Sequence, residues 1–301
     1  MSAPATAAGP ASSRVRAYYE LTKPGIAAFV MMTAGVAYFV AAAGRPQVVP
    51  LLHTVSGTLF ATAGALALNQ YLERKVDALM ERTRRRPLPS GRLTAGRALL
   101  FGLTLLAAGV VQLWLTVGFL PALLTLFSAA AYNLVYTPLK SRSYSATFAG
   151  AVPGAMPALI GWSAATGEIG VGGLALFAIA FLWQIPHVLA LAWLLKEDYA
   201  RAGFFLAPPA DPDGRFIGNQ MILYSMTLLA VSLFPTLLAI TGVLYLAGAT
   251  VLGTVLVWWS WAAQRSMTRK NVRRVFLGSL AYQPLLLGLM LIDTLPGSPG
   301  L

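Results

Sequence analysis

Nine long apolar stretches dominate this sequence and set what it can fold into. Each contains 18 or more residues, and a helix of about 20 apolar residues crosses the roughly 30 Å hydrocarbon core of a bilayer. We therefore expect an all-α, polytopic membrane protein with nine transmembrane helices. The predicted spans are Gly25–Ala43, Leu51–Leu72, Thr94–Thr116, Val117–Val135, Ala146–Ala165, Gly170–Leu195, Gly218–Ile240, Leu244–Ala263 and Val275–Ile292.

The composition agrees with this fold class. Charged residues make up 11% of the 301 residues, whereas a soluble protein carries about 25%. The net charge of +12 does not indicate nucleic-acid binding, because a nucleic-acid-binding protein places its basic face on a soluble core. The chain has no Cys and two His, which excludes disulfides, thiolate catalysis and metal sites built on sulfur or on a His cluster.

The basic residues predict an orientation. Nine spans put the N-terminus and the connections after spans two, four, six and eight on one side, and these segments hold 21 of the 22 Lys and Arg residues. The remaining one is Arg45. Basic connections stay in the cytoplasm, so we expect a multi-pass protein of the cell (inner) membrane with a cytoplasmic N-terminus. Residues 1–13 are predicted to form a disordered tail before a single domain at 14–301.

The connection after the second span carries a candidate metal site. Asn69, Glu73 and Asp77 are spaced by four residues, so they stay on one helix face and spread over about 12 Å. Oxygen ligands at the membrane surface suit Mg²⁺, which binds one or two carboxylates together with substrate phosphates. Arg82 and Arg86 follow at the same spacing, and a guanidinium pairs well with phosphate.

The alternative is that these acids only pair with neighbouring arginines on a solvated helix end. Asn69 argues against it, because a polar side chain at the inner end of an apolar span is costly unless it has a role.

A second acidic cluster, Glu197 and Asp198, follows the sixth span on the same predicted side, beside Lys196. Lys140 and Arg142 also lie on that side. Two carboxylate clusters with cations between them would bind a magnesium diphosphate, although a helix end with mixed charges is the alternative. His187 lies deeper in the sixth span and is either a packing residue or a contact for an acceptor substrate in a cavity.

The chain resembles the intramembrane prenyltransferase superfamily (the UbiA-like enzymes), and within it the branch that acts on haem. The motifs that carry the resemblance are Tyr18–Pro24, Asn69–Pro89, Tyr136–Lys140, Gly150–Gly154, Trp183–His187 and Glu197–Gly203. The resemblance implies nine helices around a central cavity and transfer of a farnesyl group from farnesyl diphosphate to a vinyl group of haem B. Water addition gives haem O, the precursor of haem A in terminal oxidases.

The resemblance also implies roles for residues. Asn69, Glu73, Asp77 and Asp198 would be catalytic, and with Glu197 they would bind Mg²⁺. The diphosphate would contact Arg82, Arg86, Lys140, Arg142 and Lys196, and haem would contact His187, Trp183 and Gln184. The expected partners are haem B, farnesyl diphosphate, the lipid bilayer and a haem A synthase, with no nucleic acid.

Three positions depart from the family pattern. Lys75 replaces a common acid, which leaves the number of bound metal ions open, and Ala146 replaces an expected Asn. The segment after Gly203 is long and acidic, and the sequence leaves open whether Asp211 or Asp213 joins the site. Three other functions remain as alternatives: a prenyltransferase for a quinone precursor or other aromatic acceptor, a non-catalytic cofactor carrier, and an assembly subunit of a respiratory complex.

Overall fold

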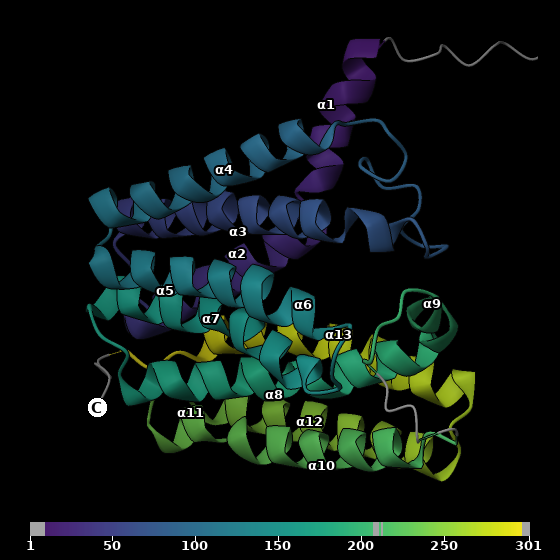
Figure 1. Cartoon of the computed structure of the whole chain (residues 1–301). Helices are drawn as coiled ribbons and strands as arrows, with labels where there is room; N and C mark the ends of the chain where they lie inside the picture. Colours follow the sequence, from purple (N-terminus) through teal and green to yellow (C-terminus); the bar gives the residue numbers. More distant parts are fainter. Residues whose placement is uncertain (1–9, 207–210, 212, 297–301) are drawn as a thin grey trace, which may run out of the picture.

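The structure, a computed structural model, describes residues 10–206, 211 and 213–296, and within these every regular element is a helix (Figure 1). The elements are α1 (Pro10–Leu21), α2 (Pro24–Ala41), α3 (Val48–Asp77), α4 (Ala95–Thr116), α5 (Phe119–Ala130), the π-helix η1 (Ala131–Tyr136), α6 (Thr137–Leu139), α7 (Ala146–Thr166), α8 (Val171–Leu194), α9 (Lys196–Arg201), α10 (Arg215–Val231), α11 (Phe234–Leu237), α12 (Val243–Arg265) and α13 (Arg269–Asp293).

The prediction of nine membrane-spanning helices is confirmed for the described part of the chain. Nine helical segments are long and apolar enough to cross a bilayer, and each overlaps one predicted span. The fourth is built from α5, η1 and α6, and the seventh from α10 and α11. The main difference lies in α3, which continues to Asp77 rather than ending near Leu72.

Helix α1 was not predicted. It begins at Pro10, so the end expected for the disordered tail, residue 13, falls inside a helix; residues 1–9 lie outside the described residues. Ala17 and Leu21 are fully buried against α3 and the start of α4. The Leu21 carbonyl accepts a hydrogen bond of 2.9 Å from Gln70 Nε2. This polar and apolar contact fixes the N-terminal helix beside the acidic end of α3.

Helices α3 and α4 pack with their backbones in contact. A Cβ atom at Gly64 would lie 2.4 Å from the Leu106 amide nitrogen, and one at Gly109 would lie 2.4 Å from that of Ala61. Small residues allow such close approach, which is the usual source of helix association in a bilayer. Helix α3 is also in contact with α2, α5 and α7.

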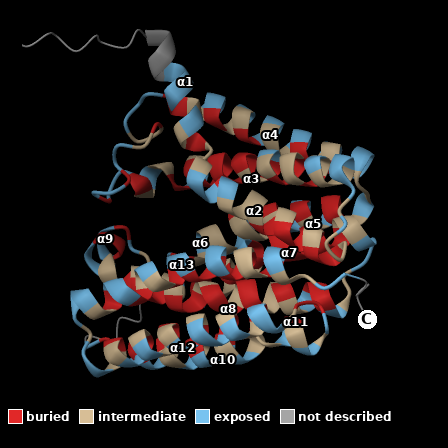
Figure 2. Ribbon diagram, turned by 180° about the vertical axis from the view of Figure 1, so that it is seen from behind, coloured by how far each residue is buried: buried red, intermediate tan, exposed pale blue. Residues whose placement is uncertain are grey.

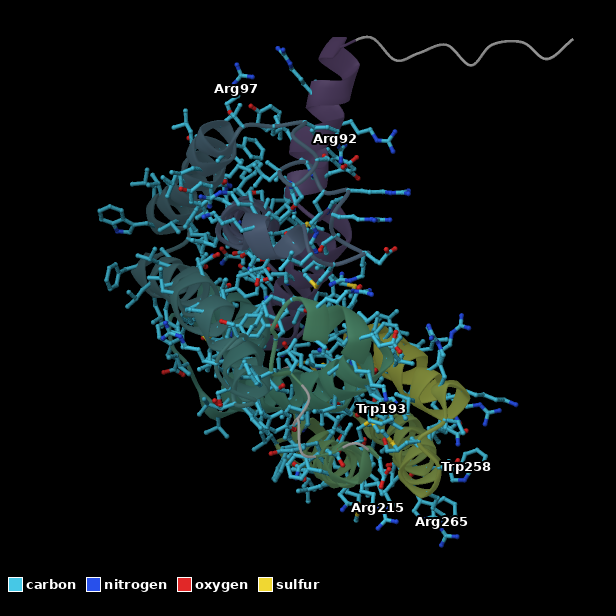
Figure 3. All side chains as sticks on the ribbon, turned by 45° about the vertical axis from the view of Figure 1, so that its right-hand side comes forward. Arg92, Arg97, Trp193, Arg215, Trp258 and Arg265 are labelled. Carbon is cyan, nitrogen blue, oxygen red and sulfur yellow. The ribbon has the colours of Figure 1, made fainter. Side chains whose placement is uncertain are left out.

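The connections rich in charge gather at one end of the bundle, which we call the charged end. It carries residues 78–94, 140–145 and 195–206 and the α12–α13 turn (Figure 1). Labelled arginines such as Arg92, Arg97 and Arg265 extend outward around it (Figure 3). Buried residues line the inward faces of the helices, and exposed ones lie on the outer surface (Figure 2). That outer surface includes large apolar side chains such as Trp114, Phe119 and Trp258, as expected for lipid contact.

Candidate active site at the charged end

The last turns of α3 carry three buried polar side chains on one face. Asn69 and Asp77 are fully buried, and Glu73 is 7% exposed. Lys75 points away from them and is exposed, because residues two apart lie on opposite sides of a helix. An acid at position 75 would therefore not have faced the other three.

Each of these three side chains contacts a cation from a different part of the chain. Lys23 Nζ donates to Asn69 Oδ1 at 3.0 Å. Lys140 Nζ donates to Glu73 Oε1 at 2.7 Å. We call this set of six residues, completed by the pair of Asp77 and Arg86, the ion-pair cluster.

The third pair has two bonds. Arg86 Nη1 lies 2.8 Å from both carboxylate oxygens of Asp77. Thr83 Oγ1 donates to the Asp77 backbone carbonyl at 2.7 Å and orders the start of the α3–α4 connection. Charge-assisted bonds of this kind are roughly twice as strong as neutral ones, so the connection folds back onto the end of α3.

Lys23 is the residue of this cluster that the sequence did not indicate as a site residue. It lies between α1 and α2 with a left-handed backbone, φ = 45°, a conformation that costs energy for a residue with a side chain. Burial, with the nearby charges of Arg86 and Lys140, lowers the pKa of Lys23 to about 7. The sequence feature that could have indicated Lys23 is its position directly before Pro24, at the start of the first span.

The second acidic residue, Asp198, comes to the same end of the bundle. It is 8% exposed and forms an ion pair with Arg201. Its Oδ1 also accepts a hydrogen bond of 3.2 Å from the Glu81 amide, four residues after Asp77. The Arg201 hydrogen bond, supported by the backbone amides of Glu81 and Arg82, holds the pKa of Asp198 below its ordinary value. The α3–α4 connection thus joins the two acidic regions.

The other predicted ligands at this end are exposed. Arg82, Arg142, Lys196 and Glu197 are solvent-accessible and are not members of the ion-pair cluster. Lys196 Nζ lies 4.2 Å from the Trp193 ring centroid. Asp211 accepts hydrogen bonds from the amides of Phe216 and Ile217, at 3.1 and 3.0 Å. It therefore stabilises the start of α10.

Two tyrosines lie directly below the ion-pair cluster. Tyr132 OH is 3.4 Å from Asn69 Oδ1, and Lys140 Nζ is 4.3 Å from the Tyr136 ring centroid. Both belong to η1, and π-helical turns occur often at functional sites. The Tyr132 carbonyl accepts both the Thr137 backbone amide of the wider turn and, at 2.8 Å, the Thr137 hydroxyl.

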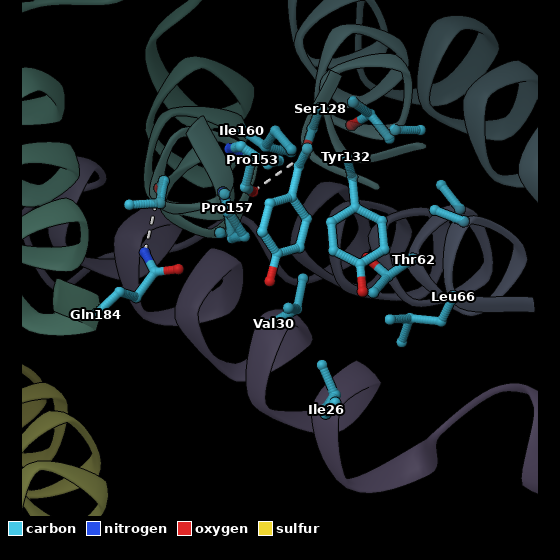
Figure 4. A pocket seen from close by; sticks show the side chains of 18 of the residues that line it. Ile26, Val30, Thr62, Leu66, Ser128, Tyr132, Pro153, Pro157, Ile160 and Gln184 are labelled. Atoms are coloured by element: carbon cyan, nitrogen blue, oxygen red, sulfur yellow. Dashed lines mark hydrogen bonds between the residues drawn. The ribbon is translucent and has the colours of Figure 1, made fainter. Parts of the chain in front are cut away.

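The same tyrosines line an apolar cavity of about 230 Å³ between α2, α3, α5, α7 and α8. Its walls are mostly small or apolar and include Ile26, Ala65, Ala129, Gly150 and Pro157 (Figure 4). Because Pro157 has no N–H, the Pro153 carbonyl lacks a helical partner. It accepts a hydrogen bond of 3.1 Å from Ser128 Oγ. The cavity therefore extends from the charged cluster into the middle of the bundle.

The residues of the Trp183–His187 motif meet two different surroundings. His187 stacks between Trp183 and Phe276, with ring centroids 5.4 and 4.8 Å away. Its Nδ1 is 3.0 Å from Ser279 Oγ on α13. Trp183 also packs against Phe29 of α2, with the two rings tilted and their centroids 5.2 Å apart. We call these four ring-bearing residues the aromatic wall.

Gln184 is three residues before His187, and therefore about 60° away from it around α8. It lines the apolar cavity together with Val188. Neighbouring parts of the α8 surface thus meet different surroundings, the aromatic wall and the apolar cavity.

The oxygen donors at the charged end fit Mg²⁺ by their chemistry, since they are carboxylates and an amide near a membrane surface. Within the described residues, however, there is no group of three or more His, Cys, Asp or Glu side chains that would hold a metal ion. Glu73, Asp77 and Asp198 are each bonded to a Lys or Arg side chain instead. A metal ion would have to take these oxygens from their cationic partners.

Comparison with known proteins agrees with this architecture. The UbiA prenyltransferase family model matches residues 30–283. A protoheme IX farnesyltransferase of Solibacter usitatus is 46% identical, covering 93% of this chain and 99% of that one. One from Koribacter versatilis is 38% identical, with 94% of each chain covered.

Solved structures show the same fold. A digeranylgeranylglyceryl phosphate synthase has a TM-score of 0.77 at 16% identity, covering 93% of this chain and 98% of that one. A UbiA homologue from Archaeoglobus fulgidus, bound to GPP and Mg²⁺, has a TM-score of 0.62 at 14% identity, with 91% and 99% covered. The nine-helix bundle and the sequence match together show that this chain belongs to the UbiA prenyltransferase family.

Proposed function

We propose that this protein transfers the farnesyl group of farnesyl diphosphate to a vinyl group of haem B, with addition of water, to give haem O. The observation that carries the proposal is the ion-pair cluster directly above an apolar cavity, in a chain 46% identical to a protoheme IX farnesyltransferase over nearly its full length. A diphosphate head and an apolar tail require this combination of surroundings.

The cations of the cluster bind the diphosphate in this proposal. In the structure Lys23 donates to the neutral Asn69 amide, and Arg86 and Lys140 neutralise Asp77 and Glu73. A diphosphate would offer these cations stronger anionic partners. Glu73, Asp77 and Asn69, with Asp198 from the second region, are the residues that would hold Mg²⁺. When bound, Mg²⁺ neutralises the charge that accumulates on the leaving diphosphate. Arg82, Arg142 and Lys196 are exposed beside the cluster, where their positive charge attracts the substrate, and the exposed Glu197 would join Asp198 as a metal ligand.

The apolar cavity holds the farnesyl chain. Its volume of about 230 Å³ lies just below the roughly 300–1,000 Å³ usual for ligand pockets, which suits a slender chain better than a porphyrin. Tyr132 and Tyr136 at its upper end present ring faces to the allylic carbon, where positive charge develops. Enclosure by α2, α3, α5, α7 and α8 keeps water from that carbon.

The aromatic wall is the place for the haem acceptor. His187, Trp183, Phe29 and Phe276 form an apolar row of rings packed against one another, and in this proposal the porphyrin lies against that row. The vinyl group then meets the farnesyl chain at the boundary between wall and cavity. A haem A synthase would use haem O as its substrate, so we propose this enzyme as a partner.

The charged end faces the cytoplasm of the cell (inner) membrane in this proposal. The support is the positive-inside bias, with 21 of 22 basic residues on that side of the topology.

The direct test is incubation of the purified protein in lipid nanodiscs with haem B, farnesyl diphosphate and Mg²⁺, followed by mass spectrometry of the haem. We expect a product heavier by one farnesyl group and one hydroxyl. An unchanged haem mass would overturn the proposal. Incubation with a quinone precursor in place of haem tests the family-level alternative, and conversion of that acceptor but not of haem would favour it.

A further inference from the structure

Gln184 presents an oxygen atom to the apolar cavity. Its Nε2 donates to the Ala180 carbonyl at 2.8 Å and to the Ala151 carbonyl at 3.2 Å (Figure 4). Both partners are acceptors, so the nitrogen must be the atom that faces them. No group of the described residues donates to Oε1, although Gln184 lines the cavity. The amide is thus fixed by its nitrogen and has a free acceptor.

Gly154 makes room for this oxygen. A Cβ atom at position 154 would lie 1.9 Å from Gln184 Oε1, far inside the contact distance of two atoms. Gly154 also lines the cavity, on α7 across from α8. The position of Oε1 therefore depends on the absence of a side chain at residue 154.

Gln184 lies between the two proposed substrate sites. His187 is three residues further along α8 and belongs to the aromatic wall, whereas Gln184 and Val188 line the cavity. Helix α2 shows the same division, with Phe29 on the wall and Ile26 and Val30 on the cavity.

Gln184 lies near the depth that the proposed function gives to the reacting allylic carbon, beside Tyr136. A Cβ atom at Gly150 would touch the ring of Tyr136, which also contacts Lys140. Gly154 is one helical turn, about 6 Å, further along α7. Gln184 therefore lies about one turn below the tyrosine at the upper end of the cavity.

We propose that Gln184 Oε1 positions the water molecule that adds to the haem side chain during the reaction. This inference rests on the proposed function. The vinyl π electrons form a bond to the first farnesyl carbon as its bond to oxygen breaks, and the diphosphate leaves with the electron pair. The porphyrin-bound carbon is then a cation. A water held by Oε1 directs its own lone pair at this carbon, and the proton it loses passes to the departing diphosphate.

The competing fate of the cation gives a specific readout. If no water is in place, the cation loses a neighbouring proton and becomes an alkene, lighter than haem O by one water. Loss of one hydrogen bond to the nucleophile should change the ratio of the two products by about tenfold. The ratio does not depend on how much enzyme is folded, so a purely structural role for Gln184 would leave it unchanged.

The experiment compares Gln184→Leu and Gly154→Ala with the wild type in nanodiscs, and measures alkene and hydrated products by mass spectrometry. We expect the alkene share to rise about tenfold in both variants. In Gly154→Ala the glutamine remains but its oxygen is displaced. Ser128→Ala is the matched control, because it removes another polar group of the cavity that bonds only to Pro153; its product ratio should equal that of the wild type.

A wild-type product ratio in Gln184→Leu would overturn the inference, as would a raised alkene share in Ser128→Ala equal to that of the other two. If Gln184→Leu yields no farnesylated haem, the ratio of alkene to hydrated product in Gly154→Ala tests the inference instead, and a wild-type ratio there would overturn it. Failure of the proposed function has a different signature, which is the absence of any farnesylated haem from the wild type.

Discussion

Lys140 Nζ lies 2.7 Å from Glu73 Oε1, and the two side chains are 9% and 8% exposed. They are 67 residues apart in the chain, on α3 and on the connection that follows α6. A buried pair of this kind is not retained for stability alone, because apolar residues of the same size are often as stable. In the proposed function the pair holds a cation for the diphosphate beside a carboxylate for the metal ion.

Replacing one residue of that pair should destabilise the protein more than replacing both. Glu73→Gln and Lys140→Met each leave one buried charge without its partner, which costs about 3 kcal/mol of unfolding free energy. The double variant leaves no charge and should recover most of that loss. Reversible unfolding in detergent gives the stabilities. Farnesyl transfer should stay below detection in all three, and an active double variant would contradict the proposed roles.

The two acidic regions should both be needed for catalysis. Asp77→Asn and Asp198→Asn keep the shape of the side chain but remove the charge that would bind metal. We expect activity to fall by about 100- to 1,000-fold for each, as for the loss of an electrostatic transition-state contact, with helicity by circular dichroism retained. Asp213→Asn is the control, because Asp213 is exposed and outside the site. Equal activity in Asp77→Asn and Asp213→Asn would exclude the proposed metal site.

Binding of farnesyl diphosphate should weaken as the pH rises through neutrality. Burial lowers the pKa of Lys23 to about 7, so this lysine carries its charge below pH 7 and loses it above. The Lys23→Arg variant keeps a charge at every accessible pH, so the wild-type KM should rise relative to that of Lys23→Arg between pH 6 and 9. This comparison cancels the titration of the substrate itself. Parallel pH profiles would contradict the role of Lys23.

The same pKa shift has a consequence for stability. Between about pH 7 and 10.5 the unfolded chain binds the Lys23 proton more strongly than the folded protein does. The unfolding free energy should therefore rise with pH across this window. The Lys23→Met variant should lack this part of the pH dependence, which unfolding at several pH values would measure.

The orientation can be tested because the chain has no cysteine. Single substitutions Ser141→Cys and Gln47→Cys place one thiol at exposed positions on opposite ends of the bundle. In intact cells an impermeant maleimide should label Gln47→Cys, while Ser141→Cys should react after the cells are lysed. The opposite pattern would place the charged end outside.

The local pattern of the sequence was sufficient for much of this protein. Apolar stretches of sufficient length are enough to define membrane helices, and all nine were predicted, with boundaries a few residues away. The four-residue spacing of Asn69, Glu73 and Asp77 places them on one face of α3 by helix geometry alone. Helix α1 was missed because its burial depends on contacts with α3 and α4 rather than on its own composition.

The tertiary structure decided which groups meet. Nothing local in the sequence indicates that Lys23, Arg86 and Lys140 each contact one residue of the same helix face. Nor does it indicate that Gln184 and His187, three residues apart, face different surroundings. Helix periodicity and hydrophobic length are properties of consecutive residues. The pairing of charges and the shape of a cavity arise from segments brought together only by packing, and so they became visible only in the folded chain.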